Sequence, residues 1–240
     1  MTNSAYGAAD TDRHTRFTDH LWDRTKVLRD AIDELEFLRR LGDGTLPLDL
    51  FRTYIEQDYL YLTGYAKALS LVSAHAPDPD TAGFWAGSAA TAATVEATLH
   101  QNLLTSGKLP QSDAKPQHSQ ACLGYVSYLT AVAATEPYPV AAAAMLPCFW
   151  IYADVGQRLA NSAREVLSAD PSHPYAQWVT TYDAEEFQTA TATARELVDA
   201  AAEAATDAQR EAMVEVFVIA SRYELMFWDT VVNKQEWPAS

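Results

Sequence analysis

Basic residues, cysteine and glycine are all scarce in this chain of 240 residues. The 17 lysines and arginines are outnumbered by 32 aspartates and glutamates, which gives a net charge of −15. Such a charge repels the phosphates of nucleic acids and of anionic membranes, so we expect neither as a partner. The two cysteines, Cys122 and Cys148, are too few for a disulfide framework. A reducing, cytoplasmic location fits this usage.

Long apolar runs and glycine-rich loops are also missing from the sequence. No run reaches the length of about 18 apolar residues that a membrane span needs. Neither a phosphate-binding glycine loop nor a Gly-x-Ser-x-Gly elbow is present. The first residues carry no apolar core, so we expect no signal peptide there and predict a partly disordered tail over residues 1–14.

Histidine offers little support for a metal site. The six histidines are scattered. Glu96 and His100 lie one helical turn apart but lack further partners at helical spacing, and a metal would need three or four. We expect this pair to brace two helices, and we predict no metal and no other cofactor.

What the chain does contain is apolar residues at helical spacing, in a composition that is 48% hydrophobic. Proline, glycine and polar breaks divide this pattern into predicted helices at about 17–41, 48–75, 81–104, 119–134, 140–159 with an extension to 168, 175–182, 184–204 and 207–233. The sequence therefore predicts an all-α bundle that forms a single domain over residues 15–240. A central pocket between helices is the usual place for a site in such a fold.

The apolar stretch from Met145 to Tyr152 holds a proline next to a cysteine. Inside a helix Pro147 removes one hydrogen bond and crowds the preceding turn, so it should kink or start a helix beside Cys148. That irregularity would let a ligand reach the thiol, and Tyr152 lies one turn further on the same face. A buried structural cysteine is the alternative, because cysteine is often buried in cores.

Two carboxylates lie on apolar helical faces. Asp58 shares its face with the tyrosines at 54, 61 and 65 and should point inward. Glu224 lies one turn from Phe227 and Trp228, where burial would raise its pKa and suit it to proton transfer near neutral pH. Either carboxylate could instead serve in a structural hydrogen bond.

Five segments together resemble the TenA family, also called thiaminase II. They are Gly42–Pro47; Phe51, Tyr54 and Gln57–Leu62; Leu146–Tyr152 with Gly156; His173-Pro174 with Trp178 and Tyr182; and Phe217–Ser221 with Tyr223-Glu224 and Phe227-Trp228. Their order and spacing extend the resemblance over nearly the whole chain, from about residue 17 to 237. One departure is Leu35-Glu36-Phe37, where the family commonly has His-Pro-Phe.

The resemblance implies a haem-oxygenase-like helical fold, usually a homotetramer, that needs no haem or metal. It also implies hydrolysis of 4-amino-5-aminomethyl-2-methylpyrimidine to the 5-hydroxymethyl pyrimidine and ammonia, and in many members cleavage of thiamine itself. By position, the nucleophile falls on Cys148, the pyrimidine-binding aspartate on Asp58 and the acid/base glutamate on Glu224. The pocket aromatics fall on Tyr61, Tyr125, Tyr152, Tyr182 and Phe227. Because all of these residues are present, Cys148 included, the resemblance is to the cysteine-bearing branch of the family.

Three other functions remain open at the level of sequence. The same chemistry could act on another aminopyrimidine, such as a formylated one. The chain could be a non-catalytic pyrimidine-binding protein. A di-iron oxygenase on the same fold would need a cluster of carboxylates and histidines, which only Glu96 and His100 approach.

Overall fold

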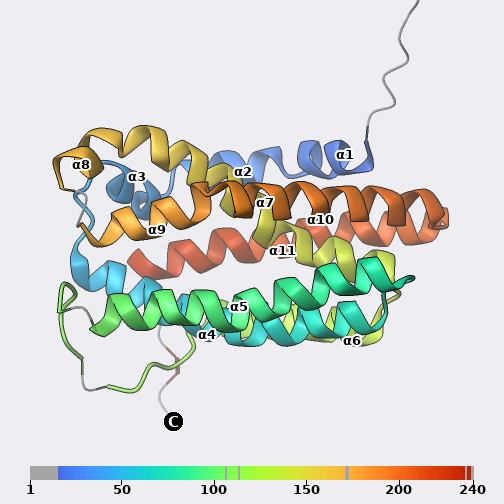
Figure 1. Cartoon of the computed structure of the whole chain (residues 1–240), viewed down its shortest axis with the longest axis horizontal. Helices are drawn as coiled ribbons and strands as arrows, with labels where there is room; N and C mark the ends of the chain where they lie inside the picture. The colour runs from blue at the N-terminus through green and yellow to red at the C-terminus, as the bar shows by residue number, and fades with distance from the viewer. Residues whose placement is uncertain (1–15, 106, 113, 171–172, 236, 239–240) are drawn as a thin grey trace, which may run out of the picture.

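The computed structural model describes residues 16–105, 107–112, 114–170, 173–235 and 237–238, without the side chains of 95–101, 165–167, 174 and 177. This part of the chain is helical and contains no strand, as predicted (Figure 1). The predicted tail, residues 1–14, lies outside the described residues, as do the side chains of Glu96 and His100.

The helices follow one another through short connections. Along the described chain they are α1 (Phe17–Arg24), α2 (Lys26–Asp33), α3 (Glu36–Gly42), α4 (Leu48–Ala74), α5 (Pro79–Thr105), α6 (Gln120–Thr135), α7 (Tyr138–Ser162), α8 (Arg164–Ala169), α9 (Pro174–Asp183), α10 (Glu185–Ala204) and α11 (Asp207–Val232).

Two groups of helices enclose α11. Helix α4 packs against α5 and α6, while α7 packs against α9, α10 and α11. Figure 1 shows α4, α5 and α6 on one side, α7, α9 and α10 on the other, and α11 between them. Residues far apart in sequence therefore meet where the two groups face each other.

Local sequence sets several helix ends. Thr206 caps α11 through a capping box with Gln209, which confirms the predicted cap. Pro47 directly precedes α4, and Gly44 turns the chain before it with a φ of 75°, a left-handed value that glycine adopts without strain. Helix α4 therefore begins where the Gly-Asp-Gly-Thr-Leu-Pro sequence predicted it.

The prediction of one helix over residues 17–41 was wrong, because the structure has three short ones. The first break is at Thr25, whose hydroxyl donates to the carbonyls of Leu21 and Trp22. The second is at Leu35, whose extended backbone precedes α3. Neither break contains proline or glycine, and the apolar residues keep their helical spacing across both, so the sequence pattern did not reveal them.

Phe37, kept from the family's His-Pro-Phe segment, is buried with its ring 5.0 Å from that of Tyr54.

A stack of four side chains fastens the first helices to the rest. The Trp22 and Trp150 rings lie 4.0 Å apart and nearly parallel. The guanidinium of Arg29 covers the outer face of this pair at Trp22, and that of Arg195 covers it at Trp150, at 3.7 and 3.9 Å from the ring centroids. Cation–π contacts of this kind stabilise by about 0.5–2 kcal/mol each. The stack therefore joins α1 and α2 to α7 and α10.

Helix α7 is the most buried of the described helices. By length and composition it could cross a membrane, but 89% of its most apolar window is buried inside the bundle. This apolar character is that of a core helix. Pro147 lies within α7, which continues from Tyr138 to Ser162, so the alternative that a helix starts at this proline was wrong.

Candidate active site

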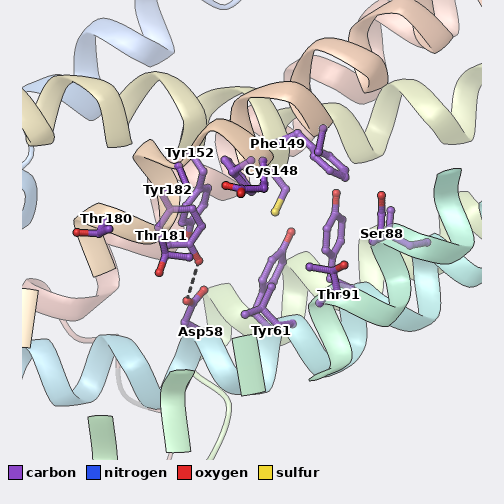
Figure 2. Close-up of a pocket in the computed structure, with 18 of the residues that line it drawn as sticks. Asp58, Tyr61, Ser88, Thr91, Cys148, Phe149, Tyr152, Thr180, Thr181 and Tyr182 are labelled. Atoms are coloured by element: carbon purple, nitrogen blue, oxygen red, sulfur yellow. Dashed lines mark hydrogen bonds between the residues drawn. The ribbon is translucent and has the colours of Figure 1, made fainter. Parts of the chain in front are cut away.

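A cavity of about 1080 Å³ lies between α4, α5, α7, α9 and α10. Its inner wall contains Asp58 and Tyr61 from α4, Cys148 and Tyr152 from α7, and Tyr182 from α9. These side chains are between 1% and 9% exposed. Figure 2 shows them facing one another across the cavity. Five of the predicted site residues, separated by up to 124 positions in sequence, thus share one cavity.

Cys148 is held by contacts to the backbone on either side of it. The Tyr65 hydroxyl donates to the carbonyl of Met145 at 2.8 Å, and the Thr191 hydroxyl donates to the carbonyl of Phe149 at 3.3 Å. These donors come from α4 and α10, so α7 is anchored on two sides around its proline. The thiol, 9% exposed, is thereby presented to the cavity.

Asp58 places a carboxylate in the inner wall. It is 1% exposed, and the Tyr182 hydroxyl lies 3.5 Å from its Oδ2, at the long limit of a hydrogen bond (Figure 2). A buried carboxylate is costly unless it is well hydrogen-bonded. Each carboxylate oxygen accepts more than one hydrogen bond, so an amino group on a ligand can also donate to Asp58.

Tyr61 presents a buried hydroxyl that has no hydrogen-bond partner among the described residues. The side chain is 2% exposed, and in Figure 2 its hydroxyl points toward the sulfur of Cys148. Burial raises the pKa of Tyr61 well above its ordinary value, and the nearby charges of Cys148 and Glu224 act in the same direction. The hydroxyl therefore stays protonated and can donate to a ligand.

Glu224 lies in the layer behind this wall rather than in it. The residue is 1% exposed, and the Tyr125 hydroxyl donates to its Oε1 at 2.7 Å. The pKa of Glu224 is raised to about 8: burial raises it most, the hydrogen bond from Tyr125 lowers it, and the charge of Asp58 raises it. Near neutral pH the carboxyl is therefore mostly protonated, and can act as an acid.

Tyr125 and Phe227 belong to the same second layer. Both rings pack on Tyr61, with centroid distances of 5.0 and 5.5 Å. Like Glu224, they are not among the described residues that line the cavity. All eight predicted site residues thus form one continuous cluster. Tyr61 connects its two layers, because it lines the cavity on one side and contacts Tyr125 and Phe227 on the other.

The sequence reasoning missed the opposite wall of the cavity. This wall includes aromatic, hydroxyl and glycine residues of α5, α7 and α10, namely Gly83, Phe84, Gly87, Ser88, Thr91, Phe149 and Phe187. Phe149 lies within the Leu146–Tyr152 segment of the family pattern but was given no role there, and no motif in the sequence distinguishes the other six from core residues. Among the described residues, no group of three or more His, Cys, Asp and Glu side chains could hold a metal ion.

Comparison with known proteins identifies relatives along nearly the whole chain. A model of the TENA/THI-4/PQQC family matches residues 23–234. The aminopyrimidine aminohydrolase of Bacillus subtilis is 34% identical over 206 residues, which are 85% of this chain and 84% of that protein. The thiamine biosynthesis multifunctional protein ThiED of Corynebacterium efficiens is 37% identical over 92% of this chain, but the chain spans 29% of its length.

Solved structures agree on the fold. A TenA homologue from P. horikoshii OT3 superimposes with a TM-score of 0.79 and 28% identity, over 91% of this chain and 99% of that one. The heme oxygenase of Leptospira interrogans gives a TM-score of 0.56 at 14% identity, over 90% of this chain and 99% of that one. The predicted haem-oxygenase-like fold is confirmed.

Proposed function

Because the chain belongs to the TENA/THI-4/PQQC family, we propose that it is a hydrolase of thiamine-derived aminopyrimidines. The proposed reaction converts 4-amino-5-aminomethyl-2-methylpyrimidine and water to the 5-hydroxymethyl pyrimidine and ammonia. Thiamine is the second proposed substrate, which would yield the same pyrimidine and the thiazole alcohol. The name of the Bacillus subtilis relative supports the first reaction.

The observation that carries this proposal is that a thiol, a carboxylate and several tyrosines converge on one cavity. A thiol, a carboxylate and three tyrosines form the inner wall, and a carboxyl with a pKa of about 8 lies one layer behind. A flat, amino-substituted heterocycle uses all of these groups. Aromatic rings stack on its faces, and a carboxylate accepts from its exocyclic amine.

In the proposed mechanism Cys148 attacks first. Its thiolate adds to the ring carbon beside the substituted one, and the ring electrons then expel the amine from the exocyclic methylene. Water adds to that methylene, and the thiolate leaves as the ring becomes aromatic again. A covalent intermediate of this kind replaces one slow displacement by two easier steps.

The two carboxyl groups, Asp58 and Glu224, have different roles in the proposed mechanism. Asp58 orients the ring by accepting from its amino group, and Glu224 delivers a proton to the ring nitrogen that gains charge when sulfur adds. Tyr61 stands between the cavity and Glu224, and no hydrogen bond to a described residue holds its hydroxyl. In our proposal the Tyr61 side chain turns aside when the pyrimidine enters. The pyrimidine ring then packs on Phe227 and comes within reach of Glu224.

The test is a substrate panel with two matched cysteine variants. Release of ammonia, hydroxymethyl pyrimidine and thiazole alcohol is followed with the aminomethyl pyrimidine, its formyl derivative and thiamine. We expect Cys148→Ala to abolish turnover while calorimetry still detects ligand binding. Cys122→Ala is the control, because Cys122 is fully buried outside the cavity and should be dispensable for chemistry. Near-normal rates in Cys148→Ala would reject the covalent mechanism, and an inert wild type would reject the proposed activity.

A further inference from the structure

The inner wall of the cavity is backed by a tyrosine that does not line it. Tyr54 of α4 is fully buried, and its ring meets that of Trp178 edge to face at 5.8 Å. Its hydroxyl lies 3.1 Å from the indole Nε1 of Trp178 and 3.4 Å from the hydroxyl of Tyr152. Of these three residues, Tyr152 lines the cavity. They form a chain of hydrogen bonds that runs from α9 through α4 to the cavity wall on α7.

The chemistry of the groups fixes the direction of this chain. An indole N–H only donates, so the Tyr54 oxygen accepts from Trp178. The hydrogen of Tyr54 then needs an acceptor, because a buried hydroxyl without a partner is costly, and the Tyr152 oxygen lies within reach. Burial raises the pKa of Tyr54 well above its ordinary value, so this hydrogen is kept. Tyr54 therefore donates to Tyr152.

Tyr152 carries the same direction into the cavity. Among the described residues, Tyr54 is the one hydrogen-bond partner of its hydroxyl, and there Tyr152 accepts. Burial raises the pKa of Tyr152 well above its ordinary value, and the charges of Tyr54 and Asp58 act in the same direction. The hydroxyl thus keeps its hydrogen and can donate it to a ligand. The distance of 3.4 Å is long for two hydroxyls, and such contacts in active sites often shorten when a ligand binds.

Asp58 offers the opposite polarity on the same wall. Its carboxylate accepts, and the Tyr182 hydroxyl near its Oδ2 belongs to a ring 5.0 Å from that of Tyr152 (Figure 2). An aminopyrimidine has a matching edge, because its amino group donates and the ring nitrogen beside it accepts. In the oxo counterpart the exocyclic oxygen accepts and that ring nitrogen carries a hydrogen, so both polarities are reversed.

We propose that Tyr54 is a positioning residue, which orients the Tyr152 hydroxyl as a donor and thereby makes the cavity select an aminopyrimidine over its oxo counterpart. This inference rests on the proposed function. Tyr54 acts through the oxygen of Tyr152 and does not touch the substrate. Without the Tyr54 hydroxyl, the Tyr152 oxygen regains a lone pair and can turn to accept from a ring N–H. Tyr54→Phe keeps the packed ring and removes one oxygen atom, so selectivity should change while the shape of the cavity is kept.

The experiment measures by calorimetry the binding of the hydroxymethyl aminopyrimidine, which is the proposed product, and of its 4-oxo counterpart. Tyr138→Phe is the matched control, because the Tyr138 hydroxyl also accepts from an indole, that of Trp85 at 3.1 Å, and does not line the cavity. Both variants leave an indole N–H without its acceptor. We expect the preference for the amino ligand, as a ratio of Kd values, to fall at least about tenfold in Tyr54→Phe and less than about twofold in Tyr138→Phe. In a Tyr152→Phe background, Tyr54→Phe should change this ratio less than about twofold.

Three outcomes would overturn the inference. They are an unchanged ratio in Tyr54→Phe, an equal change in Tyr138→Phe, and a full effect of Tyr54→Phe in the Tyr152→Phe background. If Tyr54→Phe does not fold, Trp178→Phe gives the same comparison with Trp85→Phe as its control, because it removes the donor that sets the direction.

Ammonia release from the aminomethyl pyrimidine by the same wild-type protein separates this inference from the proposed function. An inert wild type that still prefers the amino ligand would reject the proposed activity alone. An active wild type without that preference would overturn the inference alone, and an inert one without it would overturn both.

Discussion

Glu224 illustrates how the surroundings of one side chain set its chemistry. The carboxyl is buried among aromatic rings and faces the charge of Asp58, so its pKa rises to about 8 although Tyr125 donates to it. An apolar helical stripe in the sequence already indicated the direction of this shift. The size of the pKa shift depends on Asp58 from α4 and Tyr125 from α6. The spacing of residues in the sequence does not show that these two side chains lie beside Glu224.

The raised pKa of Glu224 should make the free energy of unfolding depend on pH. The folded protein keeps a proton that the unfolded chain loses above the ordinary value of 4.5, so the contribution of Glu224 is complete below that pH and is lost as pH rises toward about 8. In that window the free energy of unfolding should fall by up to about 1.4 kcal/mol per pH unit relative to Glu224→Gln. Urea unfolding of both proteins at several pH values measures the difference. Parallel pH profiles would show that Glu224 ionises normally.

The Tyr61 hydroxyl should matter for turnover and not for folding. A buried hydroxyl without a partner costs about 1–3 kcal/mol, so Tyr61→Phe should leave stability unchanged or raise it. We expect kcat/KM to fall in the same variant, because the hydroxyl faces the reacting thiol. Tyr125→Phe is the contrast: it removes the hydrogen bond to Glu224 and should destabilise the protein. Loss of stability in Tyr61→Phe would mean that the hydroxyl is hydrogen-bonded in the folded protein.

At the scale of the helices, the sequence predicted most of the architecture. Helices α4 and α11 begin where proline or a capping box occurs, and such local signals are independent of tertiary contacts. The breaks at Thr25 and Leu35 carry no such signal. There the three short helices pack on different sets of neighbours: α1 on α10 and α11, α2 on α11, and α3 on α11 and α7. Apolar spacing alone does not encode these partners.

The site was predicted only where its residues carry chemistry. Cys148, Asp58 and Glu224 are unusual in apolar helices and therefore stood out, as did the aromatic residues of the family pattern. Phe84 and Phe187 could not be separated from ordinary core residues, because a cavity is a property of packing. The roles of all these residues remain predictions.

The contact between α7 and α9 leaves no room for another atom at Gly156. A Cβ there would lie 2.8 Å from the Tyr182 Cβ and 2.9 Å from the Tyr182 backbone. We expect Gly156→Ala to lower the free energy of unfolding by about 1–3 kcal/mol and to reduce activity by moving Tyr182 away from Asp58. Gly83→Ala is the control, since its Cβ meets nothing within 4 Å and alanine favours the helix. Equal stability of the two variants in urea unfolding would contradict this close approach.

For the whole molecule, the predicted homotetramer and the cytoplasmic location still rest on resemblance and composition. The assembly can be checked by light scattering, where we expect four chain masses. Each chain carries a net charge of −15, so the subunits repel one another and salt should strengthen the tetramer by screening. A monomer at every salt concentration would reject the prediction.

The tryptophan pair between α1 and α7 provides a spectroscopic signal for the separation of the N-terminal helices from the rest of the bundle. Trp22 and Trp150 lie face to face at 4.0 Å, one on the first described helix and the other two positions after the thiol. Two indoles this close share their ultraviolet transitions, and the shared signal disappears as soon as the rings separate. Circular dichroism in the aromatic region can therefore time the release of the N-terminal helices against loss of turnover, without any attached dye.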